Sequence, residues 1–425
     1  MTGPTDAISK ARPDTGEAGG SRQALVNAEV PFAFDELFFS RTDERGIIGS
    51  GNSVFCRISQ YAWSELLERP HKVIRHPDMP KAVFHLLWET IRAGRPIGAY
   101  VKNRAKDGRY YWVYALVTPI DGGYLSVRIR PSSRLLQVVE REYRDLVALE
   151  REKRLPPAQS AEMLLARLQE LGFRNYDVFM ASALSAEISA RNEALGRPVD
   201  QEIERFDRLT EQALSLIAKS DEIFEAYLSN EHVPLNLKIH AGQLGELGAP
   251  ISVISTNYSA ISEEIRVGMD DFVGAANRVF DTIVNGQSLV ATARIQTEML
   301  SFSRKERESG DMGEPSVSDA DLALLDAQQA SYRAQARQGL VDIAREADRF
   351  RSACLEMRRL EVGLEVTRIM GKIECAHLDT TIKELDGLIK NLASFQAKLA
   401  VSLQDIEQQN RKMLHSIDRM LSTTP

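Results

Sequence analysis

Residues 110–117 read Tyr-Tyr-Trp-Val-Tyr-Ala-Leu-Val, a run of aromatic and β-branched side chains that is typical of a β-strand. Asp107-Gly108, just before this run, is a hairpin turn signal, and Ile97–Arg104 has the composition of the partner strand. After Asp121-Gly122-Gly123, a third strand is predicted over Tyr124–Ile129. The three segments together predict an antiparallel meander.

A helix is predicted ahead of the meander, over Pro80–Ala93, because apolar residues recur there every three to four positions. Pro80 stands near its start and Gly94 follows its end, as is common at helix termini. All three tryptophans of the chain lie in this part of the sequence. We therefore expect a small α+β domain, an antiparallel sheet with flanking helices, over residues 31–131.

The rest of the chain, after Pro131, is rich in helix-forming residues and is divided by short breaks that contain proline and glycine. It predicts a long all-α helical bundle or coiled coil behind the α+β domain. The first residues are polar and rich in Gly, Pro, Asp and Thr, which is typical of a disordered tail. Our division of the chain is a disordered tail at 1–30, the α+β domain at 31–131, a linker with the first helices at 132–230, a hairpin and helix at 231–308, a flexible linker at 309–319 and coiled-coil helices at 320–425.

Apolar residues repeat every seven positions near the end of the chain. This seam consists of Leu378, Leu385, Leu392, Leu399, Ile406, Met413 and Met420, with Ile382, Ile389, Leu403 and Ile417 as its companion row. Gln396 and Asn410 interrupt the companion row, and such polar positions can fix register and strand number. We expect this seam to pair two chains in a homodimer. For a second seam, the sequence leaves open whether it packs between two chains or inside one chain. This seam consists of Ile265, Met269, Phe272, Ala276, Val279, Ile283 and Val290.

Composition and charge narrow the classes of function. The formal net charge of -7 gives no electrostatic reason to bind nucleic acid. No run approaches the about 18 consecutive apolar residues that a membrane span needs. Cys56, Cys354 and Cys375 are scattered without metal-ligand spacing, which fits a reducing cytoplasm. Because Gly-rich phosphate loops and the Gly-x-Ser-x-Gly nucleophile motif are also absent, we expect a cytoplasmic protein that is not an enzyme.

Three short motifs resemble one known family in order and spacing. They are Arg75-His76-Pro77-Asp78-Met79-Pro80, Lys102-Asn103-Arg104 and Tyr111-Trp112-Val113. Together they resemble the PAS domain of the bacterial aerotaxis receptor family, which holds FAD non-covalently, and the resemblance covers Phe38–Arg130. It implies a PAS fold and a role in signal transduction, as a sensor of redox, energy or oxygen state.

The residue types in this region suit a flavin dinucleotide. Arg75 and Lys102 are candidates to neutralise a pyrophosphate, and Trp88 and Trp112 offer ring faces for stacking. Asn52, His76 and Asn103 are candidates for the few oriented hydrogen bonds of a mostly apolar pocket. By resemblance, six positions match family positions at or near the flavin: Asn52, Arg75, His76, Asp78, Trp88 and Asn103.

Two other functions remain open at this point. A haem-based gas sensor is one, because PAS pockets can hold haem through an axial histidine, for which His76 and His85 are the candidates. A scaffold whose PAS domain is empty and binds only proteins is the other. The aromatic side chains also have a plainer interpretation as core residues.

The helical half contains a second resemblance, over Asn236–Gly248 and Ile251–Ser255. These residues are similar to the hairpin tip of chemoreceptor signalling domains, which contacts the chemotaxis histidine kinase and its coupling protein. The sequence departs from that family at Pro234, His240 and Gln243. The resemblance implies a degenerate signalling hairpin, to which the helix after the PAS domain, 132–154, would relay the signal.

Overall fold

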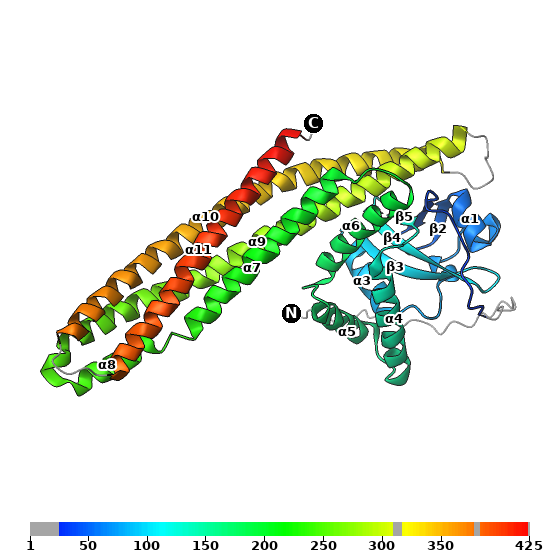
Figure 1. Cartoon of the computed structure of the whole chain (residues 1–425). Helices are drawn as coiled ribbons and strands as arrows, with labels where there is room; N and C mark the ends of the chain where they lie inside the picture. The colour runs from blue at the N-terminus through cyan, green and yellow to red at the C-terminus, as the bar shows by residue number, and fades with distance from the viewer. Residues whose placement is uncertain (1–24, 309–316, 378–382, 424–425) are drawn as a thin grey trace, which may run out of the picture.

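An antiparallel sheet lies beside one end of an elongated helical bundle in the computed structural model, which describes residues 25–308, 317–377 and 383–423 (Figure 1). The strands are β1 (Phe38–Asp43), β2 (Ile48–Gly51), β3 (Ile97–Arg104), β4 (Tyr110–Ile120) and β5 (Gly123–Ile129), in the order β2-β1-β5-β4-β3. The predicted meander of β3, β4 and β5 is confirmed.

The register of β3 and β4 separates two faces of the sheet. Tyr100 pairs with Tyr114 and Lys102 pairs with Trp112, so these four side chains share one face, because side chains alternate along a strand. We call this the outer face. Val101 and Asn103 point to the opposite, inner face, which is covered by α1 (Ser53–Ser59), α2 (Trp63–Leu66), the 3-10 helix η1 (His71–Ile74) and α3 (Lys81–Arg92).

The segment just before the sheet is ordered, although it belongs to the predicted disordered tail. The backbone N–H of Val26 donates to the Gly108 carbonyl, and that of Val30 donates to the Tyr110 carbonyl. Residues 25–30 therefore lie against the start of β4, although the sequence placed them in a disordered tail. Residues 1–24 lie outside the described residues.

The outer face of the sheet is covered by helices that follow it in the chain. These are α4 (Arg134–Glu152) and α6 (Tyr176–Ala194), while α5 (Pro157–Glu170), between them in the chain, packs against α3. The Tyr114 hydroxyl donates to the Met180 carbonyl over 3.1 Å. Gly98 makes room for this contact, since a Cβ atom there would lie 2.2 Å from the Tyr114 hydroxyl oxygen. The sheet is therefore buried on both faces.

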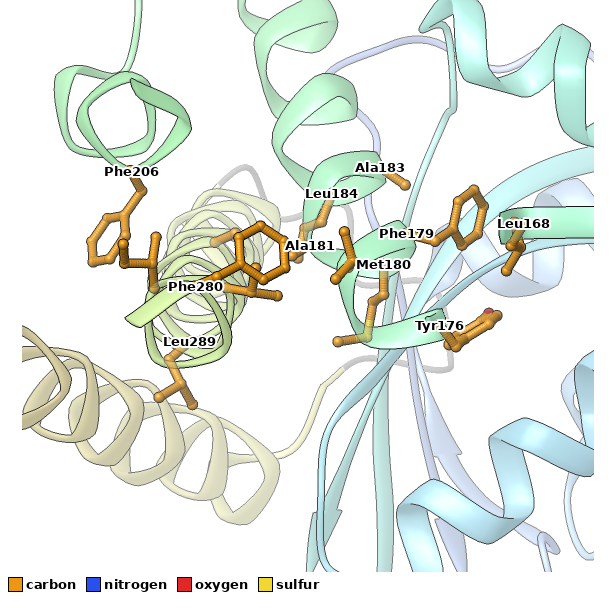
Figure 2. Packing of buried hydrophobic residues seen from close by; sticks show 14 of the residues in the cluster. Leu168, Tyr176, Phe179, Met180, Ala181, Ala183, Leu184, Phe206, Phe280 and Leu289 are labelled. Atoms are coloured by element: carbon orange, nitrogen blue, oxygen red, sulfur yellow. The ribbon is translucent and has the colours of Figure 1, made fainter. Parts of the chain in front are cut away.

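Helix α6 is apolar on two sides. Figure 2 shows Phe179 turned toward Tyr176 and Leu168, while Ala181 and Leu184 lie toward Phe280 of the bundle. All of these side chains are buried. The helix therefore forms part of the core of the α+β domain and part of the core of the bundle.

The bundle is an up-down-up-down arrangement of long helices (Figure 1). It consists of α7 (Gln201–Leu228), α9 (Ala249–Glu308), α10 (Asp319–Ala376) and α11 (Lys383–Thr423), and α9 alone is about 90 Å long at 1.5 Å per residue. The short helices α8 (Val233–Gln243) and η2 (Gly245–Gly248) reverse the chain at the far end.

The predicted use of the C-terminal heptad seam is wrong. Its described members are buried inside the single chain: Ile389, Leu392, Leu399, Leu403, Ile406, Met413, Ile417 and Met420. Helix α11 lays this seam against α7 and α10, so the four-helix bundle is completed without a second chain. The second seam is also internal, since Ile265, Phe272 and Val279 are fully buried. Leu378 and Ile382 lie outside the described residues.

None of the described helices has a stretch that is long and apolar enough to cross a membrane. Within the same residues, no group of three or more His, Cys, Asp or Glu side chains is arranged to hold a metal ion.

Candidate cofactor-binding site

A cavity of about 210 Å³ lies between the inner face of the sheet and the helices η1 and α3. Its apolar lining is Phe84, Leu87, Trp88, Ile91, Val101, Ala115, Val117 and Tyr124. Its polar lining includes Ser40, Thr42, Arg45, His71, Lys72, Arg75, Asn103, Ser126 and Arg128. A mostly apolar pocket with a few polar groups is the usual form of a small-molecule site.

Three buried polar atoms at the cavity lack a hydrogen-bond partner. Asn103 Nδ2, Ser126 Oγ and Arg128 Nη1 are buried and have no hydrogen-bond partner among the described residues. Buried polar groups are nearly always hydrogen-bonded, because leaving one unpaired costs about 1–3 kcal/mol. The side chains of Asn103 and Arg128 therefore offer donors to acceptor atoms of a ligand.

Arg128 and His71 form a coupled pair at the sheet end of the cavity. Arg128 Nη2 donates to Ser40 Oγ over 2.8 Å and lies 2.6 Å from His71 Nε2. Burial lowers the pKa of Arg128 to about 10, so the guanidinium stays charged at neutral pH. Burial, and then the charges of Arg128 and Arg75, hold the pKa of His71 well below its ordinary value. The pair therefore presents one positive charge to the cavity.

The mouth of the cavity is positively charged. Arg45, Lys72 and Arg75 line it and are exposed to solvent. The guanidinium carbon of Arg75 lies 3.3 Å from the centroid of the Phe84 ring. Trp88 lies edge-on to Tyr124, with ring centroids 5.7 Å apart. Such a mouth suits phosphate groups, and the rings behind it suit a planar ring system.

Of the eight site residues predicted from the sequence, Arg75, Trp88 and Asn103 line the cavity. Asn52 lies elsewhere: its Oδ1 accepts from the N–H groups of Phe39 and Phe55, and its Nδ2 donates to the Leu37 carbonyl. Asn52 therefore caps α1 and ties it to β1, which is a structural role.

Two further predicted residues are ordered by contacts outside the cavity. The buried His76 ring accepts at Nδ1 from the Asp78 N–H over 3.2 Å, and burial lowers the pKa of His76 to about 4. Asp78 forms ion pairs with Lys102, at 3.4 Å, and with Arg151, at 3.3 Å. This cluster joins the segment before α3 to strand β3 and to the C-terminal end of α4.

Lys102 and Trp112, which were predicted to contact the flavin, do not line the cavity, because both side chains lie on the outer face. The Lys102 ammonium lies 4.4 Å from the centroid of the Tyr110 ring, and Trp112 packs against Tyr143 of α4. The sequence defined which residues alternate along the strand, but both faces of the sheet are buried, and so the cavity face was not evident.

The two histidines that were candidates for a haem ligand lie away from the cavity. His76 and His85 do not line the cavity, and His85 pairs with Glu89 on its own helix. His71 does line it, but its Nε2 is directed at the Arg128 guanidinium.

Sequence reasoning missed His71, Ser126 and Arg128. A signal for the last two was present, since Ser126 and Arg128 alternate with Leu125, Val127 and Ile129 along β5. Polar residues at every second position of a strand mark one face of it, and here that face contains the cavity.

Comparisons with known proteins agree with this geometry. Residues 50–127 match the family model described as PAS fold. This part of the chain is a PAS domain. It is similar to the aerotaxis receptor of Escherichia coli (strain K12), with 38% identity over 140 residues. It is also similar to a nitrogen fixation regulatory protein of Klebsiella pneumoniae, with 30% identity over 81 residues.

Each of these matches covers only part of this chain and only part of the relative. The first covers 32% of this chain and 28% of the aerotaxis receptor, and the second covers 19% and 16% of the two chains. The chain therefore matches less than a third of the length of these relatives. By their names, the relatives are a receptor and a regulatory protein rather than enzymes. The predicted resemblance of the PAS domain to the aerotaxis receptor is confirmed.

Proposed function

We propose that this protein senses redox, energy or oxygen state through FAD held in the PAS cavity, and passes the signal to its helical bundle. The observation that carries the proposal is the set of unpaired buried polar atoms, Asn103 Nδ2, Ser126 Oγ and Arg128 Nη1, beside aromatic rings. When bound, a flavin supplies a ring system whose charge and hydrogen bonding change with its oxidation state.

The residues of the cavity fit the parts of such a ligand. Asn103 and Arg128 would donate to the acceptor edge of the ring, and Trp88 with Phe84 would cover its apolar part. The cavity, at about 210 Å³, is smaller than the about 300–1,000 Å³ of pockets that enclose whole drug-sized ligands. The ring would therefore be enclosed, with the phosphates at the mouth.

Two contacts offer a route from the sheet to the helices. The first is Glu187 of α6, whose carboxylate accepts from the Tyr100 hydroxyl over 2.7 Å and from the Ser133 hydroxyl over 2.6 Å. It thereby joins β3, the start of α4 and α6.

The second contact is Gln328 of α10. Its Nε2 donates to the Pro119 carbonyl over 2.7 Å, and its Oε1 accepts from Thr118 Oγ1 over 2.7 Å and from Gln296 Nε2 over 2.6 Å. The end of β4 is thus bonded to α9 and α10. A small shift of the sheet would bias the packing of these helices, because packed interfaces tend to switch between discrete arrangements.

The direct test of the cofactor is a visible absorption spectrum of the purified full chain. We expect flavin bands in the wild type and in Trp112→Phe, which changes the outer face, and loss of the bands in Asn103→Leu. A colourless, well-folded wild type would favour a cofactor-free scaffold. A sharp Soret band would move the assignment to haem.

The test of the relay is hydrogen exchange of the oxidised and the reduced protein, read by mass spectrometry. Amides of α9 and α10 around Gln296 and Gln328 should change their exchange on reduction, and Gln328→Leu should remove the change while the flavin remains bound. Identical exchange in both oxidation states would refute the relay.

The downstream partner that fits best is a chemotaxis kinase or its coupling protein, at the far end of the bundle. Leu235, Ile239 and Leu247 of α8 and η2 expose between 51% and 68% of their surface there. Exposed apolar side chains that cluster at a turn are a common form of a contact site. Binding of the purified kinase and coupling protein should fall in Ile239→Glu, and unchanged binding would contradict this partner.

A further inference from the structure

The solvent side of α10 has an apolar stripe that the bundle leaves uncovered. Its members are Leu355, Val362, Val366, Ile369 and Ile373, each between 44% and 55% exposed. The opposite side of the same helix is buried in the bundle through Cys354, Met357, Leu360 and Leu364. Helix α10 therefore has two apolar seams, of which one is buried by the described part of the chain and the other is not.

The spacing of the exposed stripe is that of a coiled-coil seam. Leu355, Val362 and Ile369 are seven residues apart, and Val366 and Ile373 each follow a member of this row by four residues. These are the d and a positions of a heptad repeat. Arg359 occupies the remaining a position between Leu355 and Val366.

Helix α9 adds a second row on the same side. Val253 and Val267 are 60% and 57% exposed and stand two heptads apart, with the small, exposed Ala260 between them. The Arg359 guanidinium lies 3.5 Å from Glu264 of α9, and a Cβ at Gly363 would lie 3.4 Å from Ile261. We call the two rows together the α9–α10 face.

We propose that the α9–α10 face pairs with the same face of a second copy of this chain. A heptad seam is buried by another helix with the same repeat, and a second copy presents one. The face is about 30 Å long and two helices, about 20 Å, wide, which gives about 600 Å² for each partner, close to the about 800 Å² of a standard interface.

The charges of the face are compatible with this partner. Arg359, the charged residue within the seam, is hydrogen-bonded to Glu356 over 2.7 Å and lies beside Glu264. A second copy would therefore meet a paired guanidinium rather than a free cation. The pairing is independent of what the PAS cavity holds.

The test is the mass of the full chain in solution by light scattering after size exclusion. We expect a dimer for the wild type and at least an about tenfold weaker dimer for Val362→Glu with Ile369→Glu. Because both positions are half exposed, circular dichroism should be unchanged. A second double variant, Val366→Lys with Ile373→Lys, should give the same loss with the opposite charge.

The matched control is Leu214→Glu with Val401→Glu, which adds the same charges at exposed apolar positions of α7 and α11. This variant should remain a dimer. A monomeric wild type would overturn the proposal, and so would a dimer that survives both face variants or is lost in the control.

Discussion

The Nη2 atom of Arg128 lies 2.6 Å from the Nε2 atom of His71, although both side chains can be cations. A guanidinium only donates hydrogen bonds, so His71 Nε2 must be the acceptor and its proton must lie on Nδ1. The low pKa of His71, caused by burial and by the two arginines, agrees with a neutral ring. Arg128 is thus held as a cation with Nη1 free for a ligand.

Removing the charge of Arg128 should weaken the binding of the proposed flavin and lower its reduction potential. In Arg128→Met we expect at least about tenfold weaker flavin binding, because a charge-assisted hydrogen bond of about 1.5–3 kcal/mol is lost. The reduction potential should also fall, since the cation favours a negatively charged reduced ring. Titration of the apoprotein and a redox titration measure the two effects. Arg109→Met, which changes a half-buried arginine outside the cavity, is the control, and equal affinity in both variants would contradict the assignment.

Asn52 and Asn103 should respond in opposite ways to substitution. Asn52→Ala should lower the free energy of unfolding by about 2–3 kcal/mol, because the N–H groups of Phe39 and Phe55 lose their acceptor. Asn103→Leu should cost less than about 1 kcal/mol, since its Nδ2 has no partner to lose. Urea unfolding of the apoprotein distinguishes them. Equal losses would show that Asn103 is structural.

Mild acid should destabilise the PAS domain. The pKa of His76 is lowered to about 4, chiefly by burial, while that of an unfolded histidine is about 6.5. Between these values the unfolded chain binds a proton that the native state does not, so stability falls as the pH falls from 6.5 toward 4. His76→Gln should show a shallower fall of melting temperature with pH than the wild type.

The exposed His232→Gln is the control for this titration. It should show the same fall of melting temperature with pH as the wild type, because it lies between α7 and α8, outside the PAS domain. If the melting temperatures of His76→Gln and the wild type fell in parallel as the pH is lowered, this result would contradict a buried, neutral His76 in the native state.

The Glu187 carboxylate should be essential to the outer face. Glu187→Gln should lower the free energy of unfolding by about 2–4 kcal/mol, because an amide donor would face the hydroxyl and N–H donors around it. Thermal unfolding measures this change, and the exposed Glu193→Gln should leave it unaltered. A loss no larger than that of the control would remove Glu187 from the proposed relay.

Asn410 should lower the stability of the bundle while it fixes the register of the buried seam of α11. Its Nδ2 donates to the Ala347 carbonyl over 2.8 Å, but its Oδ1 is buried without a partner in the described part of the chain. We expect Asn410→Leu to raise the free energy of unfolding by about 1 kcal/mol and to loosen the register of α11, measured by urea unfolding and by hydrogen exchange. A lower stability than that of the exposed Gln408→Leu would contradict this.

Strands β3, β4 and β5 and helix α3 could be predicted because local signals and tertiary packing agree there. The predicted Ile97–Arg104 is β3 to the residue, and the predicted helix Pro80–Ala93 is α3 within one residue at each end. Strand β1 gave no such signal, because it is short and includes Arg41 and Asp43.

The periodicity of each apolar surface could be predicted from the sequence, but the partner against which it packs could not. A heptad repeat states that a helix buries one side, but not whether the partner belongs to the same chain. The α11 seam therefore was assigned to a dimer, although α7 and α10 cover it. For the same reason Trp112 and Lys102 were predicted to be site residues. The alternation of side chains along a strand defines two faces, but it does not show which of them lines the cavity.

Helix α6, which is packed between two cores, sets the smallest unit that can fold alone. A fragment that stops at Pro131 would leave Tyr100, Trp112 and Tyr114 facing water, although it contains every strand of the sheet. When the sheet unfolds, α6 also loses its packing against Phe280 and its neighbours in the bundle. The PAS domain and the helical bundle should therefore unfold in a single calorimetric transition, and mutations that weaken either one should lower the same peak.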